Sequence, residues 1–242
     1  MESNKDLVVR FYDSLFNKGD LGVVDELVAP GYVDHVPGAG DGPAALKAAV
    51  AGIRAAQPGM RVEVVRAVAE QDLVLLHVDA GAFAVAGIFR VARGKIVEHW
   101  EVMQGVPAGS DMFSQVGAGG EGDRQVALDF FEEVAYERDL SAFDRYVAEP
   151  YHQHTPGLAD GIAASKARLA GAFAAYPELR MNVARVVAEG DLVAVHHHFR
   201  TGADDRGVAV VDIFRVLGGK VVEHWDVVQS VPEALADVES MF

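Results

Sequence analysis

The sequence predicts an α+β fold that is built twice along the chain, each time as three helices packed on a curved antiparallel sheet. Three observations predict it: an internal repeat, a helical period of apolar residues in the first part of each copy, and alternation of apolar and polar residues in the second part. The chain has 242 residues, which is enough for two small hydrophobic cores.

The internal repeat is visible in matched segments. The offset between the copies is 125 residues in the second part and 119 in the first, so six residues are inserted in the second copy, around 203–207. The clearest matches are 88–91 with 213–216, and 98–107 with 223–232, where seven of ten residues agree. We therefore expect domains at 1–116 and 123–242, joined by a glycine-rich linker at 117–122.

Each copy begins with three expected helices. Leu7, Val8, Phe11 and Leu15 share one face of the first helix, with Ser3 as a suitable N-cap. A short second helix follows, then a polar segment expected to be a loop, then a third helix. The second and third helices are expected at 21–28 and 43–56, and again at 140–147 and 162–175.

Four strands are expected after the helices of each copy. The period changes to two after Pro58 and after Pro177, and short glycine-containing turns separate the apolar runs. The expected strands are 61–69, 72–80, 83–92 and 95–104, and then 180–189, 191–200, 208–217 and 220–229.

Composition excludes several classes of function. The formal charge of −15 disfavours nucleic acid and anionic membrane surfaces as partners, and no apolar run is long enough to span a bilayer, so we expect a cytoplasmic protein. The chain has no Cys, which removes thiolate nucleophiles, disulfides and cysteine-bound metals. Phosphate-binding glycine motifs and the nucleophilic serine elbow are also missing, so nucleotide cofactors and serine hydrolysis have no support.

Asp212 is the strongest candidate for chemistry. Alternation along its strand places Val208, Val210, Asp212 and Phe214 on one face, so the carboxyl has apolar neighbours. Burial would raise the pKa of Asp212 toward the working pH, as a general acid or base requires. The alternative is that Asp212 pairs with Arg215, Arg185 or a histidine and only rigidifies the sheet. The first copy has Gly87 at this position and is expected to be inactive by the same mechanism.

Histidines and aromatic residues supply further candidates. His154, matched by His35, lies two residues before a proline that restricts its backbone, so we expect it to orient substrate or polarise a carbonyl, or else to be an ordinary loop residue. Tyr151 could reach the same pocket. On the last strand, Trp225 is expected to pack in the core or an interface, or to contact substrate.

Three consecutive histidines invite a metal hypothesis. His196 and His198 share one face of a strand and His197 takes the other, so two of them could join Asp212 in a metal site. The first copy keeps only His77 of the three, which argues against a metal. His196 and His198 then belong to an ordinary strand face, or one of them has a pocket role without metal.

The element order, the segment Tyr-His-Gln-His-Thr-Pro at 151–156 and the ending at 212–229 resemble the SnoaL-like polyketide cyclases. That family belongs to the nuclear transport factor 2-like superfamily of cone-shaped α+β barrels, so the resemblance implies two tandem cones. It also implies that Asp212 is the acid/base and that His154 points into the mouth of the cone, although Thr155 replaces the asparagine that many members carry. The family uses no metal, and its domains commonly pair, which implies an intramolecular pseudo-dimer that could pair again.

The expected function is therefore a cofactor-independent ring closure on a small apolar, polyketide-like carbonyl substrate in the second copy. Asp212 would take a proton next to a carbonyl, with His154 and His198 polarising the oxygen. Alternatives that stay open are isomerisation, dehydration or epoxide opening in the same pocket, and a non-catalytic binder or scaffold.

Overall fold

The computed structural model describes residues 2–115 and 122–242, so the expected linker at 117–122 lies outside the described residues apart from Gly122. The chain forms two compact units. The first contains Met1–Gly105 together with Pro232–Phe242, and the second contains Val106–Val231. These units do not follow the repeat boundaries, because each takes the segment that follows the last strand of the other repeat.

Three helices open each repeat, close to the expected positions. The first helix starts at Ser3, whose hydroxyl accepts from the backbone N–H of Asp6, and it continues beyond the α-helical part as a π-helical turn. In the first unit the elements are α1 (Asn4–Tyr12), a π-turn (Asp13–Lys18), α2 (Gly22–Leu27) and α3 (Gly42–Ala56). In the second they are α4 (Arg124–Glu132), a π-turn (Glu133–Glu137), α5 (Ala142–Tyr146) and α6 (Ile162–Ala175).

The antiparallel meander is confirmed in both units. Neighbouring strands pair in the order β5-β4-β3-β2 and β10-β9-β8-β7. The strands are β2 (Glu63–Glu70), β3 (Leu73–Asp79), β4 (Phe83–Ala92) and β5 (Lys95–Gly105), then β7 (Arg180–Glu189), β8 (Leu192–Arg200), β9 (Val208–Leu217) and β10 (Lys220–Ser230).

A fifth strand in each sheet was not expected. The segments predicted as loops form β1 (Val28–Asp34) and β6 (Val147–Gln153), which pair in parallel with β5 and β10. Pro150 lowers the strand tendency of the sequence, but an edge strand pairs on one side only and tolerates a residue without an N–H. This strand matters for the site, because side chains alternate along a strand and β6 therefore decides which residues near its end face the cavity.

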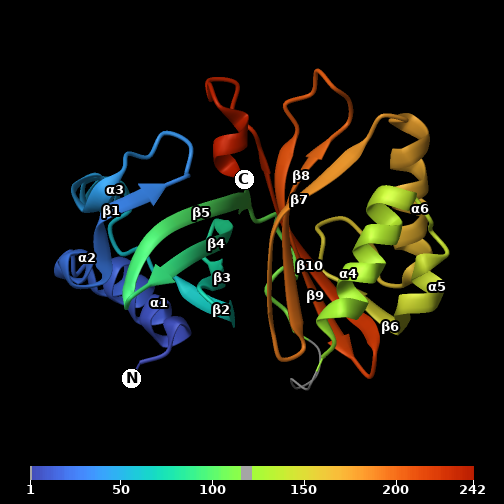
Figure 1. The fold of residues 1–242 in the computed structure, drawn as a ribbon, viewed down its shortest axis with the longest axis horizontal. Coiled ribbons are helices and arrows are strands. Elements are labelled where there is room, and N and C mark those ends of the chain that lie inside the picture. Colours follow the sequence, from blue (N-terminus) through green and yellow to red (C-terminus); the bar gives the residue numbers. More distant parts are fainter. Residues whose placement is uncertain (1, 116–121) are drawn as a thin grey trace. The chain divides into compact units, whose positions relative to one another are not determined.

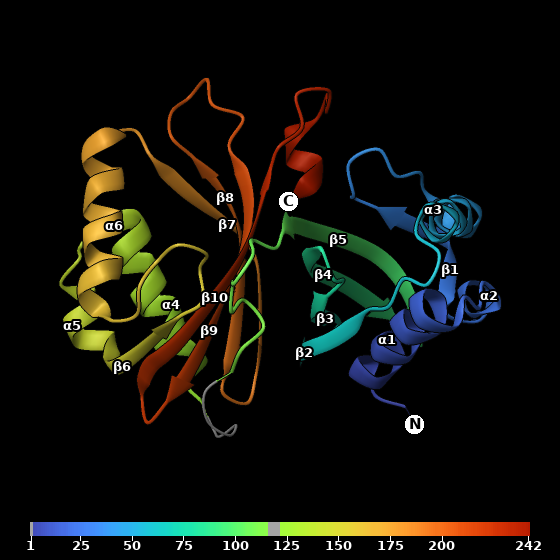
Figure 2. The same ribbon diagram turned by 180° about the vertical axis from the view of Figure 1, so that it is seen from behind.

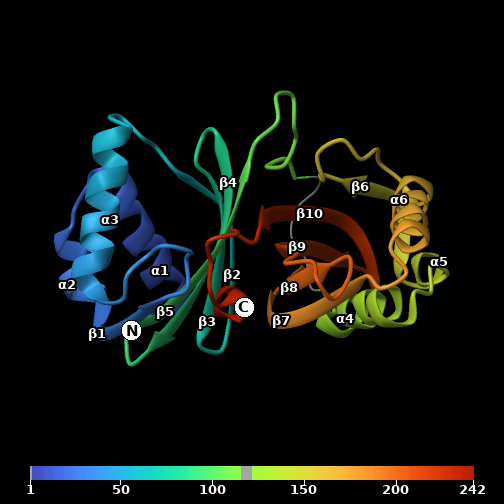
Figure 3. The ribbon, with the colours of Figure 1, turned by 90° about the horizontal axis from the view of Figure 1, so that it is seen from above.

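The helices of each unit lie together on one face of its curved sheet (Figures 1, 2 and 3). The core lies between the two layers: in the second unit it joins Phe130 and Phe143 of the helices to Val195 and Phe214 of the sheet. This arrangement confirms the predicted α+β class with two tandem units. In the described part of the chain, every helix is too short or too polar to cross a membrane.

Candidate active site

A cavity of about 240 Å³ lies in the second unit between the helices and the inner face of the sheet. The alternation predicted for β9 is confirmed, since Val208, Val210, Asp212 and Phe214 all line it. Most of the remaining lining is apolar. Its polar members are Tyr151, Gln153, Thr155, Ser165, Arg168, His197, Asp212, His224 and Asp226.

Asp212 is held by two imidazoles. Its Oδ2 lies 2.8 Å from Nε2 of His197, and its Oδ1 lies 2.9 Å from Nε2 of His224. Burial raises the pKa of Asp212, but these two hydrogen bonds outweigh burial and hold the pKa below its ordinary value. The expected upward shift is therefore wrong for this residue, and Asp212 pairs with histidines, as the alternative expectation had it.

His224 connects Asp212 to the end of β6. Its Nδ1 lies 2.7 Å from Oε1 of Gln153, and that oxygen also accepts the backbone N–H of Thr155. The second contact fixes which end of the amide faces the ring. The two nitrogens of His224 thus face oxygen atoms on opposite sides, Oε1 of Gln153 and Oδ1 of Asp212, which links the end of β6 to Asp212.

Asp226 is the second carboxyl of the cavity. It lies opposite Asp212 in the register of β9 and β10, so the two side chains are on the same face. Burial raises the pKa of Asp226, and the charge of Asp212 adds to this. His224, a hydrogen bond from Thr155 and the charge of Arg168 oppose it, and the net shift is upward. Its Oδ1 is buried without a hydrogen-bond partner among the described residues. One carboxyl thus stays charged while its neighbour holds its proton more tightly.

Sequence reasoning passed over His224 and Asp226. Both copies keep Glu-His-Trp on the last strand, which favoured a structural interpretation. The useful signal was the alternation, because it places both residues on the face opposite Trp225 and across the hairpin from Asp212.

Tyr151 and Phe214 are two further residues that line the cavity. Burial and the two nearby aspartates raise the pKa of Tyr151, so its hydroxyl stays neutral and available as a donor. The ring of Phe214 packs against His224 with centroids 4.9 Å apart, which helps to hold the imidazole in place.

His196 and His198 lie on the other face of β8, and His197 is the one that faces the cavity. His196 contacts Arg185, and burial lowers its pKa to about 3. His198 bonds through Nε2 to the carbonyl of Arg206, at 2.8 Å. The pocket role predicted for these two histidines is therefore wrong. No cluster of three or more His, Asp or Glu side chains suited to a metal occurs in residues 2–115 and 122–242.

His154 and Trp225 are not among the residues that line the cavity. Their rings stack at 5.1 Å, and His154 lies between Oε1 of Glu223 at 2.8 Å and Oδ2 of Asp111 at 2.9 Å. Because β6 is a strand, Gln153 and Thr155 face the cavity while His154 points outward. The expectation that His154 and Trp225 contact substrate is thus corrected by the geometry.

Comparisons with known families agree with this architecture. Residues 125–234 match the family of SnoaL-like polyketide cyclases, and residues 8–99 match the SnoaL-like domain. The protein is a tandem of two SnoaL-like domains. No curated protein matches it by sequence.

Solved structures resemble one SnoaL-like domain at a time. TsrD from Streptomyces laurentii is 24% identical, with 45% of this chain and 92% of that chain covered and a TM-score of 0.38. A candidate polyketide cyclase from Bacillus cereus is 20% identical over 43% and 72%, with a TM-score of 0.38. A candidate ketosteroid isomerase from Kribbella flavida is 21% identical over 49% and 86%, with a TM-score of 0.40.

The first SnoaL-like domain has different side chains at several positions that line the cavity of the second. At Gly87, which replaces Asp212, an added Cβ would lie 3.1 Å from the ring of Phe89, and that ring stacks on His99 at 4.4 Å. Phe16 and Leu46 pack against the first core at the positions that Ala135 and Ser165 occupy in the second. The first SnoaL-like domain thus has larger side chains than the second at two positions that line the cavity of the second.

Proposed function

We propose that the second domain is a cofactor-independent enzyme that closes a ring in a small polyketide-like carbonyl substrate by an aldol-type reaction. The observation that supports this best is the carboxyl pair of Asp212 and Asp226, whose pKa values are shifted in opposite directions inside one apolar cavity. Such a separation is how one site provides a fixed charge and a group that exchanges protons.

Asp226 is the better candidate for the proton-exchanging group. Its pKa is raised toward the working pH, whereas that of Asp212, to which the sequence assigned this role, is lowered. Asp212 then serves as a permanent anion that orients His197 and His224. The neutral hydroxyl of Tyr151 lines the same cavity and can donate to an oxygen that gains charge.

The steps balance without a cofactor. The Asp226 carboxylate takes a proton from a carbon between two carbonyls, and the electrons of that C–H bond form an enolate. The enolate carbon bonds to a second carbonyl carbon of the same molecule, whose π electrons move to its oxygen. That alkoxide takes the proton back from Asp226, which is then ready again. Protons between two carbonyls are already acidic, so positioning and one tuned carboxyl can suffice.

The test is product analysis with candidate polyketones and four forms of the protein: wild type, Asp226→Asn, Asp212→Asn and Glu101→Gln. Glu101 is the matched control, since it lies opposite Gly87 in the first domain just as Asp226 lies opposite Asp212. We expect Asp226→Asn to lose about 100-fold or more in turnover, and Glu101→Gln to lose none.

Two outcomes would change this assignment. Full turnover by Asp226→Asn would refute the role of Asp226, and loss confined to Asp212→Asn would return the base to Asp212. Isomerisation, dehydration and epoxide opening use the same proton transfers, so the identity of the product separates them from ring closure. A ligand that co-purifies unchanged in native mass spectrometry, with no turnover of any candidate, would favour a binding protein.

A further inference from the structure

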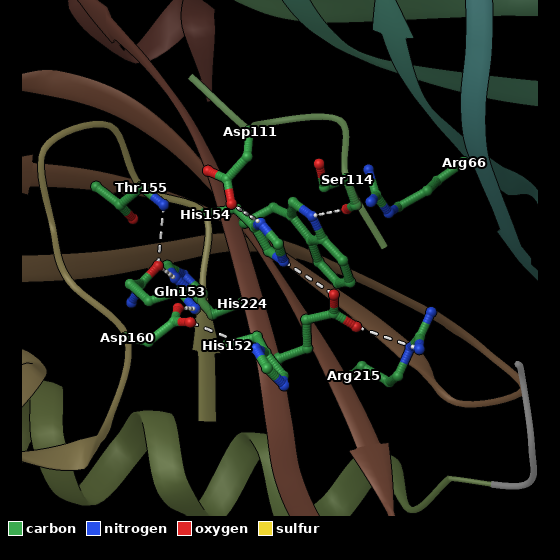
Figure 4. A network of polar contacts seen from close by, with 12 residues as sticks. Arg66, Asp111, Ser114, His152, Gln153, His154, Thr155, Asp160, Arg215 and His224 are labelled. Atoms are coloured by element: carbon green, nitrogen blue, oxygen red, sulfur yellow. Dashed lines mark hydrogen bonds and ion pairs between the residues drawn. The ribbon is translucent and has the colours of Figure 1, made fainter. Parts of the chain in front are cut away.

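The second unit begins with a segment that belongs, by sequence, to the first repeat. We call residues 106–115 the strap. Met112 in the strap is 1% exposed, the carbonyl of Ser114 accepts from Nε1–H of Trp225 at 2.8 Å, and Asp111 pairs with His154. Figure 4 shows Asp111 and Ser114 approaching His154 from a segment outside the sheet.

The first unit has a corresponding strap. Its strap is residues 232–242, where Met241 is 3% exposed and the carbonyl of Ser240 lies 2.9 Å from Nδ1 of His35. His35 stacks on Trp100 with centroids 4.7 Å apart, as His154 does on Trp225. Both straps bury a methionine and contact a stacked histidine–tryptophan pair, which indicates that the strap is a regular part of the fold.

The two straps differ in charge. The first unit's strap offers His35 only a neutral carbonyl, whereas Asp111 offers His154 a carboxylate. Burial lowers the pKa of His154, but its hydrogen bonds to Glu223 and Asp111 outweigh burial and raise the pKa above its ordinary value. Arg215 lies on the far side of Glu223, at 3.2 Å, and partly balances that carboxylate.

The segment held by the strap also supports the cavity. The backbone N–H of His154 donates to the carbonyl of His224 at 2.9 Å, and the neighbouring Gln153 holds the ring of His224 from the other side. His224 in turn holds Asp212 and faces Asp226. The outer contact at Asp111 and the inner row at Asp212 therefore share one short piece of backbone, residues 153–155.

We propose that the first repeat completes the candidate site of the second through its strap, with Asp111 as a positioning residue that fixes His154 and thereby the row from Gln153 to Asp212. The proposal rests on the candidate site described above, but it does not depend on which reaction occurs there. It also gives the first repeat, which has Gly87 in place of Asp212, a part in the chemistry of the second.

The test uses the full chain with Asp111→Ala and Asp111→Asn, and Ser240→Ala as the matched control. Ser240 contacts His35 through its backbone, so its substitution leaves that contact in place. The readouts are imidazole NMR signals of His154 and His224, and the affinity for 2-naphthol, a bicyclic phenol, followed by its fluorescence.

We expect Asp111→Ala to lower the titration midpoint of His154, to shift the ring signals of His224, and to weaken 2-naphthol binding about two- to tenfold. Asp111→Asn should do the same to a smaller extent, and Ser240→Ala should change none of the three. Unchanged His224 signals and probe affinity in Asp111→Ala would refute the proposal, as would equal effects from Ser240→Ala. If 2-naphthol fails to bind wild type, the proposed function is weakened, while the His224 signals still decide the role of the strap.

Discussion

At the scale of single residues, the two carboxyls of the cavity differ in whether histidines bond to them. Asp212 and Asp226 lie on the same face of neighbouring strands, yet two imidazoles reach only the first. A buried carboxylate with donors on both oxygens stays ionised, and a carboxyl beside it then avoids a second negative charge. The histidines thus set the proton affinity of Asp226 as well, through Asp212.

Asp212→Asn should lower the melting temperature at pH 7 by about 5 °C or more, because it removes a buried charge from a pair of histidines. The pKa of Asp212 is depressed in the folded state from a reference of 3.8, so its contribution to stability is fully present above that value and is lost as the pH falls below it. The difference from wild type should therefore narrow below about pH 4.

Circular dichroism melts between about pH 3 and pH 7 check this expectation. Asp144→Asn is a suitable control, since that carboxylate is exposed and pairs with Lys166. A gap between Asp212→Asn and wild type that is constant over the whole range would show that the charge of Asp212 is not what stabilises the fold.

At the scale of elements, alternation predicted the inward face of β9 correctly, because a strand has one period and the residues around Asp212 are strongly apolar. It could not decide which of the three histidines of β8 shares that face. This depends on the register of the hairpin, in which Val195 lies opposite Asp212, and the inserted residues 203–207 hide that register from the sequence.

The strand β6 was missed for a different reason. Its sequence contains Pro150 and polar residues, and its pairing partner, β10, lies about 70 positions further along the chain. No local sequence pattern indicates such a strand. Without the strand, the sequence gives His154 a place at the cavity and gives no role to Gln153. The long-range contacts of Asp111 cannot be predicted from the periodicity of the sequence at all.

The helices decide how much space the sheet encloses. Ala135→Phe copies Phe16 of the first domain into the second and should place a ring in the cavity. We expect the affinity for 2-naphthol to fall about tenfold or more while the melting temperature changes little, because the added ring enters space that is already open. Binding can be followed by fluorescence titration.

Ser165→Ala is the control for that experiment, since it removes a hydroxyl from the same wall without adding volume. Undiminished 2-naphthol binding by Ala135→Phe would mean that the probe occupies another place.

At the scale of the whole molecule, the two units exchange the segments that follow their last strands. Met112→Ala should therefore destabilise the second unit, and Met241→Ala the first, each through loss of a buried side chain worth about 2–5 kcal/mol. Hydrogen exchange read by peptide checks this: protection should fall in β10 for Met112→Ala and in β5 for Met241→Ala. Loss of protection confined to the repeat that carries the substitution would contradict the exchange of straps.

This exchange of segments between the two units affects how the gene can be divided. The second unit is one continuous stretch, Val106–Val231, and can be cut out with its strap as its leading end. The first unit is discontinuous, so its excision needs the last eleven residues, 232–242, to be rejoined at a new place or added as a peptide. A cut made in the glycine-rich segment, where the repeat boundary invites it, would separate each half from a piece of its own fold.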